Sequence, residues 1–449
     1  MSALALEVER LDGMLPIRIV GRVAELRGLT VLAEELPLPV GALVAVGPKR
    51  LPGEVVGFSR DRSSVMMLGS LSGVRPGDTV EGVSASADGP VGEGLLGRVV
   101  NALGEPIDHG PGAWVSARRP LSPAPLGAMS RGRITKPLRT GVRAIDLMTP
   151  LGRGQRMGVF AGPGVGKSTL LGQISRGTDA DAVVIGLIGE RGREVRDFVE
   201  ETLGAEGLKR ATVVVATGDE SPLMRLRAAK LACAQAEHLR DEGLDVLLVM
   251  DSVTRFAHAQ RQVGLSVGEP PATKGYTPSV FSELALLLER AGTVDGGGSV
   301  TGLYTILVEG DDMTEPVADT ARGILDGHVI LSRSLAQRGH YPAIDVLDSV
   351  SRVAGELMDQ RQAAATGMAR RLLAKFAEVE ELVRIGAYAR GADPETDAAI
   401  EFKDAIDAVL TQTTAERAGF EDASELLLRV ALQAGERVSE LTGDTGRGG

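Results

Sequence analysis

The segment VFAGPGVGKSTLLG, residues 159–172, constrains the fold of this 449-residue chain more than any other feature. It follows an apolar run typical of a strand and opens a helical pattern, a setting that predicts a phosphate-binding loop in an α/β domain. Gly162, Gly164 and Gly166 permit a tight loop whose backbone N–H groups point at phosphate, and the helix N-terminus adds partial positive charge. The alternative is a chance glycine-rich turn, which this succession of strand, loop and helix disfavours.

The residues of the loop have separate predicted tasks. Lys167 can reach the β- and γ-oxygens of a nucleoside triphosphate, and the Ser168 hydroxyl can bind Mg²⁺. Ala161 stands where such loops have their first glycine, and we expect its methyl group to be tolerated because this position precedes the tight turn. The predicted nucleotide-binding residues here are Gly162, Pro163, Gly164, Val165, Gly166, Lys167, Ser168 and Thr169.

A second candidate is Asp251, which ends the apolar run DVLLVMD, residues 245–251. A carboxylate at the C-terminal tip of a strand can hold Mg²⁺ through water, as the aspartate paired with such loops does. Many buried strands end in aspartate for no such reason. The position of Asp251, 84 residues after Lys167 in an α/β pattern, favours the metal-binding role.

The segment LIGERGREVRDF, residues 187–198, supplies a candidate catalytic carboxylate. Glu190 follows an apolar strand, where its side chain can orient and polarise an attacking water. Arg191 and Arg193 would then lie close to phosphate or help to position Glu190. The alternative is a solvated, charged helix start, and the local pattern alone leaves both interpretations open.

Changes of pattern along the chain predict three domains between two terminal segments. Short β-rich runs separated by Gly- and Pro-containing turns predict a small barrel or sandwich over residues 16–90. Apolar strands alternating with helical stretches predict an α/β domain, a parallel sheet wrapped by helices, over residues 91–353. Helical periodicity predicts a helical domain over residues 354–441. Residues 1–15 are expected to be a docking or flexible segment, and residues 442–449 a disordered tail.

Composition excludes several classes of protein. The net charge of −11 and the 3% aromatic content argue against broad nucleic-acid binding, which needs a basic surface and stacking platforms. Cys233 is the single cysteine, so the chain forms no internal disulfide, and the five histidines have no zinc-ligand spacing. No apolar run approaches the roughly 18 residues of a membrane span, and the N-terminus has no export-signal pattern. These features predict a cytoplasmic protein.

Four motifs resemble those of the catalytic subunits of the F-type ATP synthase superfamily: AGPGVGKST, GERGRE, MDSVTRFA and YPAIDVLDSVSR. Three longer segments are similar to the type III protein-export ATPases, most closely those of the flagellar export apparatus: GEPPATKGYTPSVFSELALLLERAG, VEGDDMTEPVADTARGILDGHVILSR and LVRIGAYARGADPETDAAI. The resemblance runs from about residue 18 to residue 441, and such long motifs are highly specific. It implies a RecA-like P-loop ATPase core with a small N-terminal β-barrel and a C-terminal helical domain, using ATP and Mg²⁺.

The resemblance also implies roles for single residues. Glu190 matches the catalytic glutamate of the family, which the non-catalytic subunits of ATP synthase lack. Tyr341 matches the tyrosine that packs on the adenine of its own site, and Arg352 matches the arginine finger that enters a neighbour's site. A chain with both implies a homomeric ring with shared sites, most simply a hexamer. Core packing of Tyr341 and a structural ion pair of Arg352 are the alternatives, and Arg255 can line the phosphate site or the subunit interface.

The expected function is Mg²⁺-dependent ATP hydrolysis that energises or primes export of flagellar proteins. By resemblance, the expected partners are a stator-like regulator at the N-terminus, a central coiled-coil stalk, a membrane export gate, and export substrates with their chaperones. With these partners, the chain is expected to be cytoplasmic and to associate peripherally with the inner face of the cytoplasmic membrane. The alternatives are the ATPase of a virulence-type injection apparatus, a RecA-like RNA translocase, and a nucleotide-binding subunit without turnover. The loops at residues 268–271 and 309–312 can face a ring channel or the site edge, or can be plain turns.

Overall fold

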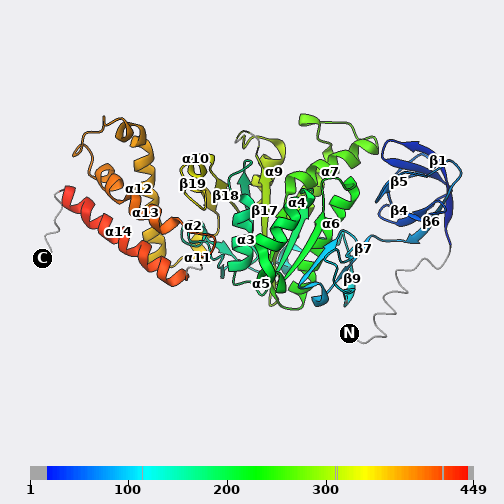
Figure 1. Cartoon of the computed structure of the whole chain (residues 1–449), viewed down its shortest axis with the longest axis horizontal. Coiled ribbons are helices and arrows are strands. Elements are labelled where there is room, and N and C mark those ends of the chain that lie inside the picture. The colour runs from blue at the N-terminus through cyan, green and yellow to red at the C-terminus, as the bar shows by residue number, and fades with distance from the viewer. Residues whose placement is uncertain (1–17, 114, 309, 311, 417–418, 443–449) are drawn as a thin grey trace.

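The computed structural model describes residues 18–113, 115–308, 310, 312–416 and 419–442. The chain forms a β-barrel, a central α/β region and a C-terminal helical region, which follow one another along its longest axis (Figure 1). The N-terminal docking segment and residues 443–449 of the expected tail lie outside the described residues. Among the helices of the described part, none is long and apolar enough to cross a membrane.

The N-terminal region is a closed six-stranded barrel with the strand order β1-β2-β5-β4-β3-β6. Its interior is filled by small apolar side chains such as Val31, Val55, Val65 and Val80. The barrel strands end at Ser84, a few residues before the expected boundary, because the next strand pairs elsewhere. The strands are β1 Val20–Arg27, β2 Thr30–Glu34, β3 Leu43–Val46, β4 Leu51–Ser59, β5 Arg62–Met67 and β6 Thr79–Ser84.

The central region contains one large sheet in the order β19-β18-β12-β17-β15-β13-β14-β8. Five of its strands, namely β12, β13, β14, β15 and β17, coincide with apolar runs of the sequence. The strands from β18 to β8 in this order are parallel. The sheet is not wholly parallel as expected. Residues 332–343 connect the C-terminal end of β18 to the start of β19 beside it, so β19 runs antiparallel to β18. The strands are β8 Arg98–Asn101, β12 Arg156–Ala161, β13 Ala182–Ile188, β14 Ala211–Ala216, β15 Asp245–Asp251, β17 Ser299–Leu307, β18 Gly327–Leu331 and β19 Ile344–Ser351.

Two hydrophobic clusters cover the two faces of this sheet. Successive strand residues point to opposite faces, so Val159 and Val183 join one cluster whereas Phe160 and Val184 join the other. The cluster of Phe160 and Val184 includes residues of α6 Pro222–Asp241, α7 Val253–Ser266, α8 Pro278–Leu288 and α9 Pro316–Ile324. The cluster of Val159 and Val183 includes residues of α2 Arg143–Met148, α3 Lys167–Gly177, α4 Gly192–Asp197 and the π-helix η3 Phe198–Leu203.

Short elements complete the central region. A small sheet of β7 and β9 packs against α6, and two further pairs join β10 to β11 and β16 to β17. The strands are β7 Asp88–Val91, β9 Ala117–Pro120, β10 Pro137–Leu138, β11 Leu151–Gly152 and β16 Gly292–Thr293. The short helices are η1 Glu93–Leu95, η2 Ala128–Ser130, α5 Gly204–Lys209, η4 Thr273–Gly275, α10 Arg333–Gln337 and α11 Ala354–Leu357.

The C-terminal region consists of α12 Gln360–Arg384, α13 Pro394–Leu410 and α14 Phe420–Thr442. It is fixed to the central region through α2, whose last carbonyls lack partners within that helix. The side chains of Gln362, Thr366 and Arg370 donate to three of these carbonyls, at 3.0, 2.8 and 2.8 Å. No strand follows Ser351 in the described part of the chain, as the helical periodicity predicts.

Candidate active site

The glycine-rich loop lies between β12, which ends at Ala161, and α3, which begins at Lys167. Gly164 and Gly166 have φ values of 77° and 88°, in the left-handed region where a side chain is strained. The Ala161 methyl group is buried in the core beneath the loop, which fits the expectation that an alanine is tolerated there. The turn thus opens the N-terminus of α3 toward the edge of the sheet.

Lys167 meets two carboxylates that the sheet brings to this edge. Leu187 of β13 is paired with Asp251 of β15, so the residues that follow the two strands lie side by side. The Lys167 Nζ forms an ion pair with Asp251 and lies 3.7 Å from Glu190 Oε1. Both carboxylates are buried, Asp251 with 3% and Glu190 with 8% of its surface exposed. Three residues that the sequence singles out therefore form one buried charged cluster.

Arg255 completes this cluster from the first turn of α7. Its Nε lies 3.3 Å from Glu190 Oε1, and its Nη2 donates to Glu190 Oε2 at 3.4 Å. Gly189 permits the contact, because a Cβ at that position would lie 2.8 Å from Arg255 Cδ. The structure therefore places Arg255 beside Glu190, in one cluster with Lys167 and Asp251.

The electrostatics of the cluster raise the pKa of Glu190 above its ordinary value. Burial is the main cause, and the charge of Asp251 adds to it, whereas Lys167 and Arg255 act in the opposite direction. A carboxylate whose pKa is raised holds a proton more readily than an exposed one, which suits a group that polarises water.

Thr305 is a site residue that the motif analysis missed. It lies on β17, fully buried, and its hydroxyl donates to Asp251 Oδ1 at 2.7 Å. This bond fixes the orientation of the carboxylate that faces Lys167. The available signal was a polar residue near the C-terminal end of β17, next to the strand that ends in Asp251. Because β17 also contains Ser299 and Thr301, polarity alone did not single out Thr305.

Tyr341 lies on the other side of the glycine-rich loop. It lines a cavity of about 270 Å³ together with Gly166, Thr169 and Gln412. A Cβ at Gly166 would lie 3.6 Å from Tyr341 Cε1, so the ring stands directly beside the loop. Gln412 N donates to Tyr341 O at 2.8 Å, which ties this position to the connection between α13 and α14 of the helical region. Tyr341 is 45% exposed, so its ring offers a stacking surface for a planar group.

Arg352 lies away from this cluster, at the opposite edge of the sheet. β19 begins beside Leu331 at the loop edge and ends at Ser351 beside Gly327, where the parallel strands begin. Arg352 follows Ser351 and is exposed, with its Nη2 donating to Arg322 O at 3.3 Å. The structure does not bring it near Lys167.

Arg191 and Arg193 also point away from the cluster. Their side chains are 81% and 84% exposed and lie near acidic residues of their own helix, Glu194 at 3.2 Å and Asp197 at 3.9 Å. A catalytic role for Arg191 stays a prediction, because its side chain does not contact Glu190 or Lys167 here.

The glycine-rich loop, the strand-end carboxylates and the central sheet define a P-loop nucleotide-binding protein with a RecA-like core. Residues 141–351 match the model of the ATP synthase alpha/beta family, nucleotide-binding domain, and residues 358–429 match that of the T3SS EscN ATPase C-terminal domain. The chain belongs to the ATP synthase alpha/beta family, in the branch of flagellar and type III secretion ATPases. The predicted fold and the predicted enzyme class, an ATPase, are confirmed.

Relatives of known name match most of the chain. The flagellum-specific ATP synthase of Treponema pallidum is 50% identical, over 91% of this chain and 92% of the relative. That of Caulobacter vibrioides is 48% identical, over 95% and 98%. The type 3 secretion system ATPase of Xanthomonas euvesicatoria is 50% identical, over 85% and 86%. The assembled ATPase EscN of enteropathogenic E. coli superposes with a TM-score of 0.85 and 40% identity, over 92% of this chain and 100% of EscN.

Proposed function

We propose that this chain hydrolyses ATP at the interfaces of a homohexameric ring, and that the turnover energises or primes flagellar protein export. The observation that carries the shared site is the position of Arg352. The eight residues of β19 separate it from the loop edge, and at about 3.3 Å per residue this is roughly 25 Å. An arginine side chain does not span that distance, so Arg352 serves a neighbour's site.

The proposed chemistry assigns each residue of the cluster a task. The loop amides and Lys167 bind the phosphates, Tyr341 stacks on adenine, and Glu190 orients and polarises the attacking water. Arg255 holds Glu190 and offers a second positive charge toward the γ-phosphate. Arg352 of the adjacent subunit stabilises the charge that develops during transfer.

The donor set of the site fits Mg²⁺. Asp251 is a buried carboxylate oriented by the Thr305 hydroxyl, and Ser168 stands in the first turn of α3. Hydroxyl and carboxylate oxygens are the ligands that Mg²⁺ accepts beside phosphates, and Asp251 would hold it through water. When bound, Mg²⁺ supplies charge neutralisation at the β- and γ-oxygens.

Removal of the metal is expected to abolish turnover. With excess chelator, ATP hydrolysis should fall to background and return on adding Mg²⁺. Ser168→Ala should raise the Mg²⁺ concentration for half-maximal rate by about tenfold, because it removes one oxygen ligand. The measurement is a Mg²⁺ titration of the steady-state rate, with Ser175→Ala on the same helix as the control. An unchanged midpoint in Ser168→Ala would contradict the assignment.

Tyr341→Ala is expected to weaken ATP binding and spare the chemical step. Loss of about 1–2 kcal/mol of stacking corresponds to a roughly 5- to 30-fold higher KM, with kcat within about twofold of wild type. Tyr341→Phe keeps the ring and should behave like wild type. The check is a steady-state titration of the three proteins with ATP, and a fall of kcat at constant KM would exclude the adenine role.

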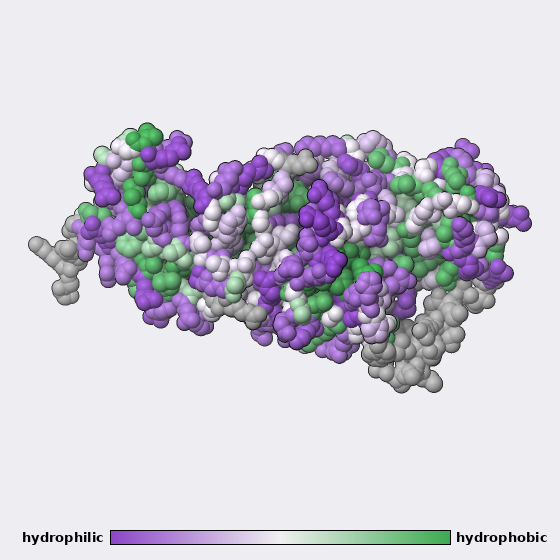
Figure 2. Space-filling model, viewed as in Figure 1, coloured by the Kyte–Doolittle hydropathy of each residue, from purple (hydrophilic) through white to green (hydrophobic). Residues whose placement is uncertain are grey.

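The proposed partners follow from relatives. EscN has been solved in complex with its central stalk EscO, and we extend a stalk partner to this chain. A regulator at the N-terminus, an export gate, and substrates with chaperones complete the set, at the inner face of the cytoplasmic membrane. Figure 2 shows hydrophobic residues gathered on the helical region, where Leu382, Ile385 and Leu432 are exposed, and these suit protein partners.

The flagellar assignment rests on the long motifs that resemble the flagellar export ATPases and on the flagellum-specific ATP synthases of Treponema and Caulobacter, which match 91% and 95% of the chain. The Xanthomonas secretion ATPase matches 85%, as does the flagellum-specific ATP synthase of Pseudomonas aeruginosa, so genetic complementation is what separates the two systems. Expression in a strain that lacks its flagellar ATPase should restore motility, whereas restored effector secretion in an injection-apparatus mutant alone would favour the alternative. Stimulation of turnover by RNA would instead indicate a translocase.

A further inference from the structure

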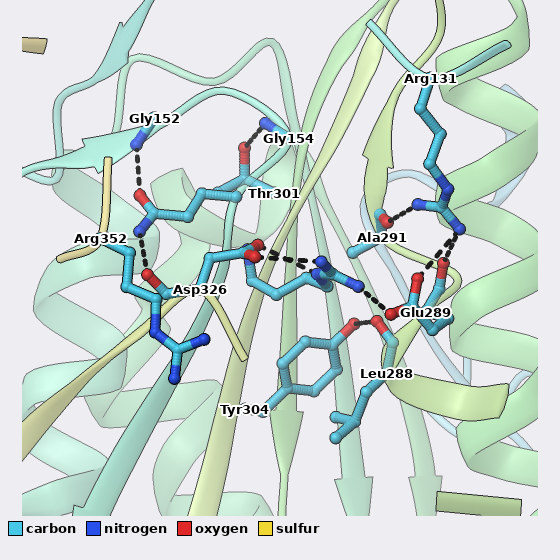
Figure 3. A network of polar contacts seen from close by, with 12 residues as sticks. Arg131, Gly152, Gly154, Leu288, Glu289, Ala291, Thr301, Tyr304, Asp326 and Arg352 are labelled. Carbon is cyan, nitrogen blue, oxygen red and sulfur yellow. Dashed lines mark hydrogen bonds and ion pairs between the residues drawn. The ribbon is translucent and has the colours of Figure 1, made fainter. Parts of the chain in front are cut away.

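A polar network lies at the edge of the sheet opposite the glycine-rich loop, and it surrounds the base of Arg352. Figure 3 shows it extending from Arg131 and Glu289 on one side to Asp326 and Arg352 on the other. Its members come from six segments of the chain: Arg131, residues 152–156, residues 288–291, residues 301–304, Asp326 and residues 351–352. The proposed shared site uses Arg352 alone among them, so the function of the rest is open.

The contacts closest to Arg352 involve its backbone and the preceding residue. Arg352 N donates to Asp326 O at 2.9 Å. Gln155, which is fully buried, donates through Nε2 to Ser351 Oγ at 3.1 Å and to Asp326 O at 3.2 Å. Its Oε1 accepts from Gly152 N at 2.8 Å, so the amide has a fixed orientation. The end of β19 is thereby bonded to the segment that precedes β18.

A second layer holds Asp326 itself. The Arg156 guanidinium donates to both Asp326 carboxylate oxygens at 3.0 Å, in the two-pronged geometry that fixes a planar pair, and Arg156 N donates to Oδ2 at the same distance. Arg156 also pairs with Glu289, which Arg131 contacts at 3.2 Å. Both members of the Arg156–Asp326 pair are mostly shielded from water, with side chains 18% and 22% exposed. Removing one partner of such a pair lowers the stability of the fold substantially, because the other charge is left buried and unpaired.

The Arg352 side chain, in contrast, has a single described hydrogen bond, to the Arg322 carbonyl. Its direction is therefore set by its backbone rather than by side-chain partners in its own subunit. Gly327 tightens this end of the β18–β19 pair, because a Cβ there would lie 2.4 Å from Val350 O. A finger that must meet a phosphoryl group in another subunit needs such an anchored base, since a misplacement of about 1 Å can cost about 100-fold in rate.

We propose that Gln155 and Asp326 are positioning residues for the arginine finger, acting through the Ser351 side chain and the Arg352 backbone on the neighbour's site. The proposal rests on the shared site proposed above. It adds that a hydrogen-bond network in the same subunit as Arg352 positions this arginine for the neighbour's site. Neither residue touches nucleotide.

Asp326→Asn is expected to lower kcat for ATP roughly 10- to 100-fold with KM within about twofold, because the finger shifts while the nucleotide site stays intact. The matched control is Asp245→Asn. Asp245 lies at the same edge and pairs with Arg153, and among the described residues it has no bond to Ser351 or Arg352. The control should keep kcat within about twofold. An equal fall of kcat in both variants, or a KM effect alone in Asp326→Asn, would overturn the proposal.

Co-assembly separates a lent finger from a damaged fold. Asp326→Asn subunits keep Glu190, and Glu190→Gln subunits keep an intact network and finger, so mixed rings should regain turnover. If Glu190→Gln subunits rescue Arg352→Ala but do not rescue Asp326→Asn, the positioning role is contradicted and the shared site stands. Failure of both rescues would remove the shared site on which the proposal rests. If Asp326→Asn does not assemble, Ser351→Ala is used in both experiments. It is expected to lower kcat several-fold and to be rescued by co-assembly with Glu190→Gln. An unchanged kcat would overturn the proposal.

Discussion

Arg352→Ala is expected to lower ATP turnover by about 10³-fold or more while ATP binding stays nearly normal. The variant keeps the glycine-rich loop, the buried cluster and Tyr341, all of which lie at the other edge of the sheet. What it lacks is the positive charge that a neighbour receives in the transition state. The measurement is a steady-state ATPase assay beside a fluorescent-nucleotide titration, at matched oligomer concentration.

Arg437→Ala is the matched control for the loss of an exposed arginine. Arg437 lies on α14 and pairs with Glu401 and Glu440, far along the chain from the sheet. It should turn over ATP at the wild-type rate. Weakened nucleotide binding with kcat preserved in Arg352→Ala would contradict the finger role, because it would place the arginine in ground-state binding.

Glu190→Gln is expected to lower kcat by about 10²–10⁴-fold, the range that a positioned general base contributes. The amide keeps the size of the side chain but cannot accept a proton from water. It also removes one of the two carboxylates that face Lys167, so we expect ATP to bind at least as tightly as in wild type. Single-turnover hydrolysis and equilibrium binding together test both expectations.

Glu200→Gln provides the control for a charge change in the same part of the chain. Glu200 is exposed on η3 and pairs with Arg196. Its turnover should match wild type within about twofold, since surface substitutions of this kind have small effects. Wild-type kcat in Glu190→Gln would show that the cluster does not use this carboxylate as the base.

The local motifs predicted much of the site before the structure. The glycine-rich loop, Asp251 and Glu190 all follow apolar strands, and parallel strands deliver such residues to one edge of a sheet. Thr305 and Arg255 were harder to assign, because their contacts depend on strand order and on the space that Gly189 leaves. A sequence pattern carries neither.

The network beneath Arg352 had no local signal at all. Arg156 and Asp326 are 170 positions apart, and Gln155 and Ser351 are 196 positions apart. Each looks like an ordinary polar residue at the end of a strand until the sheet order brings β12, β18 and β19 together. The antiparallel direction of β19 was missed for the same reason, and that direction separates Tyr341 from Arg352.

The most direct test of shared sites is to mix Glu190→Gln with Arg352→Ala. Each variant alone should be inactive, because every site lacks either the base or the finger. In randomly mixed rings at equal amounts, a site with Glu190 next to a subunit with Arg352 occurs in roughly a quarter of positions. Our account predicts recovery approaching a quarter of the wild-type rate. Normal assembly with no recovery would contradict it, because Arg352 would then not act across the interface.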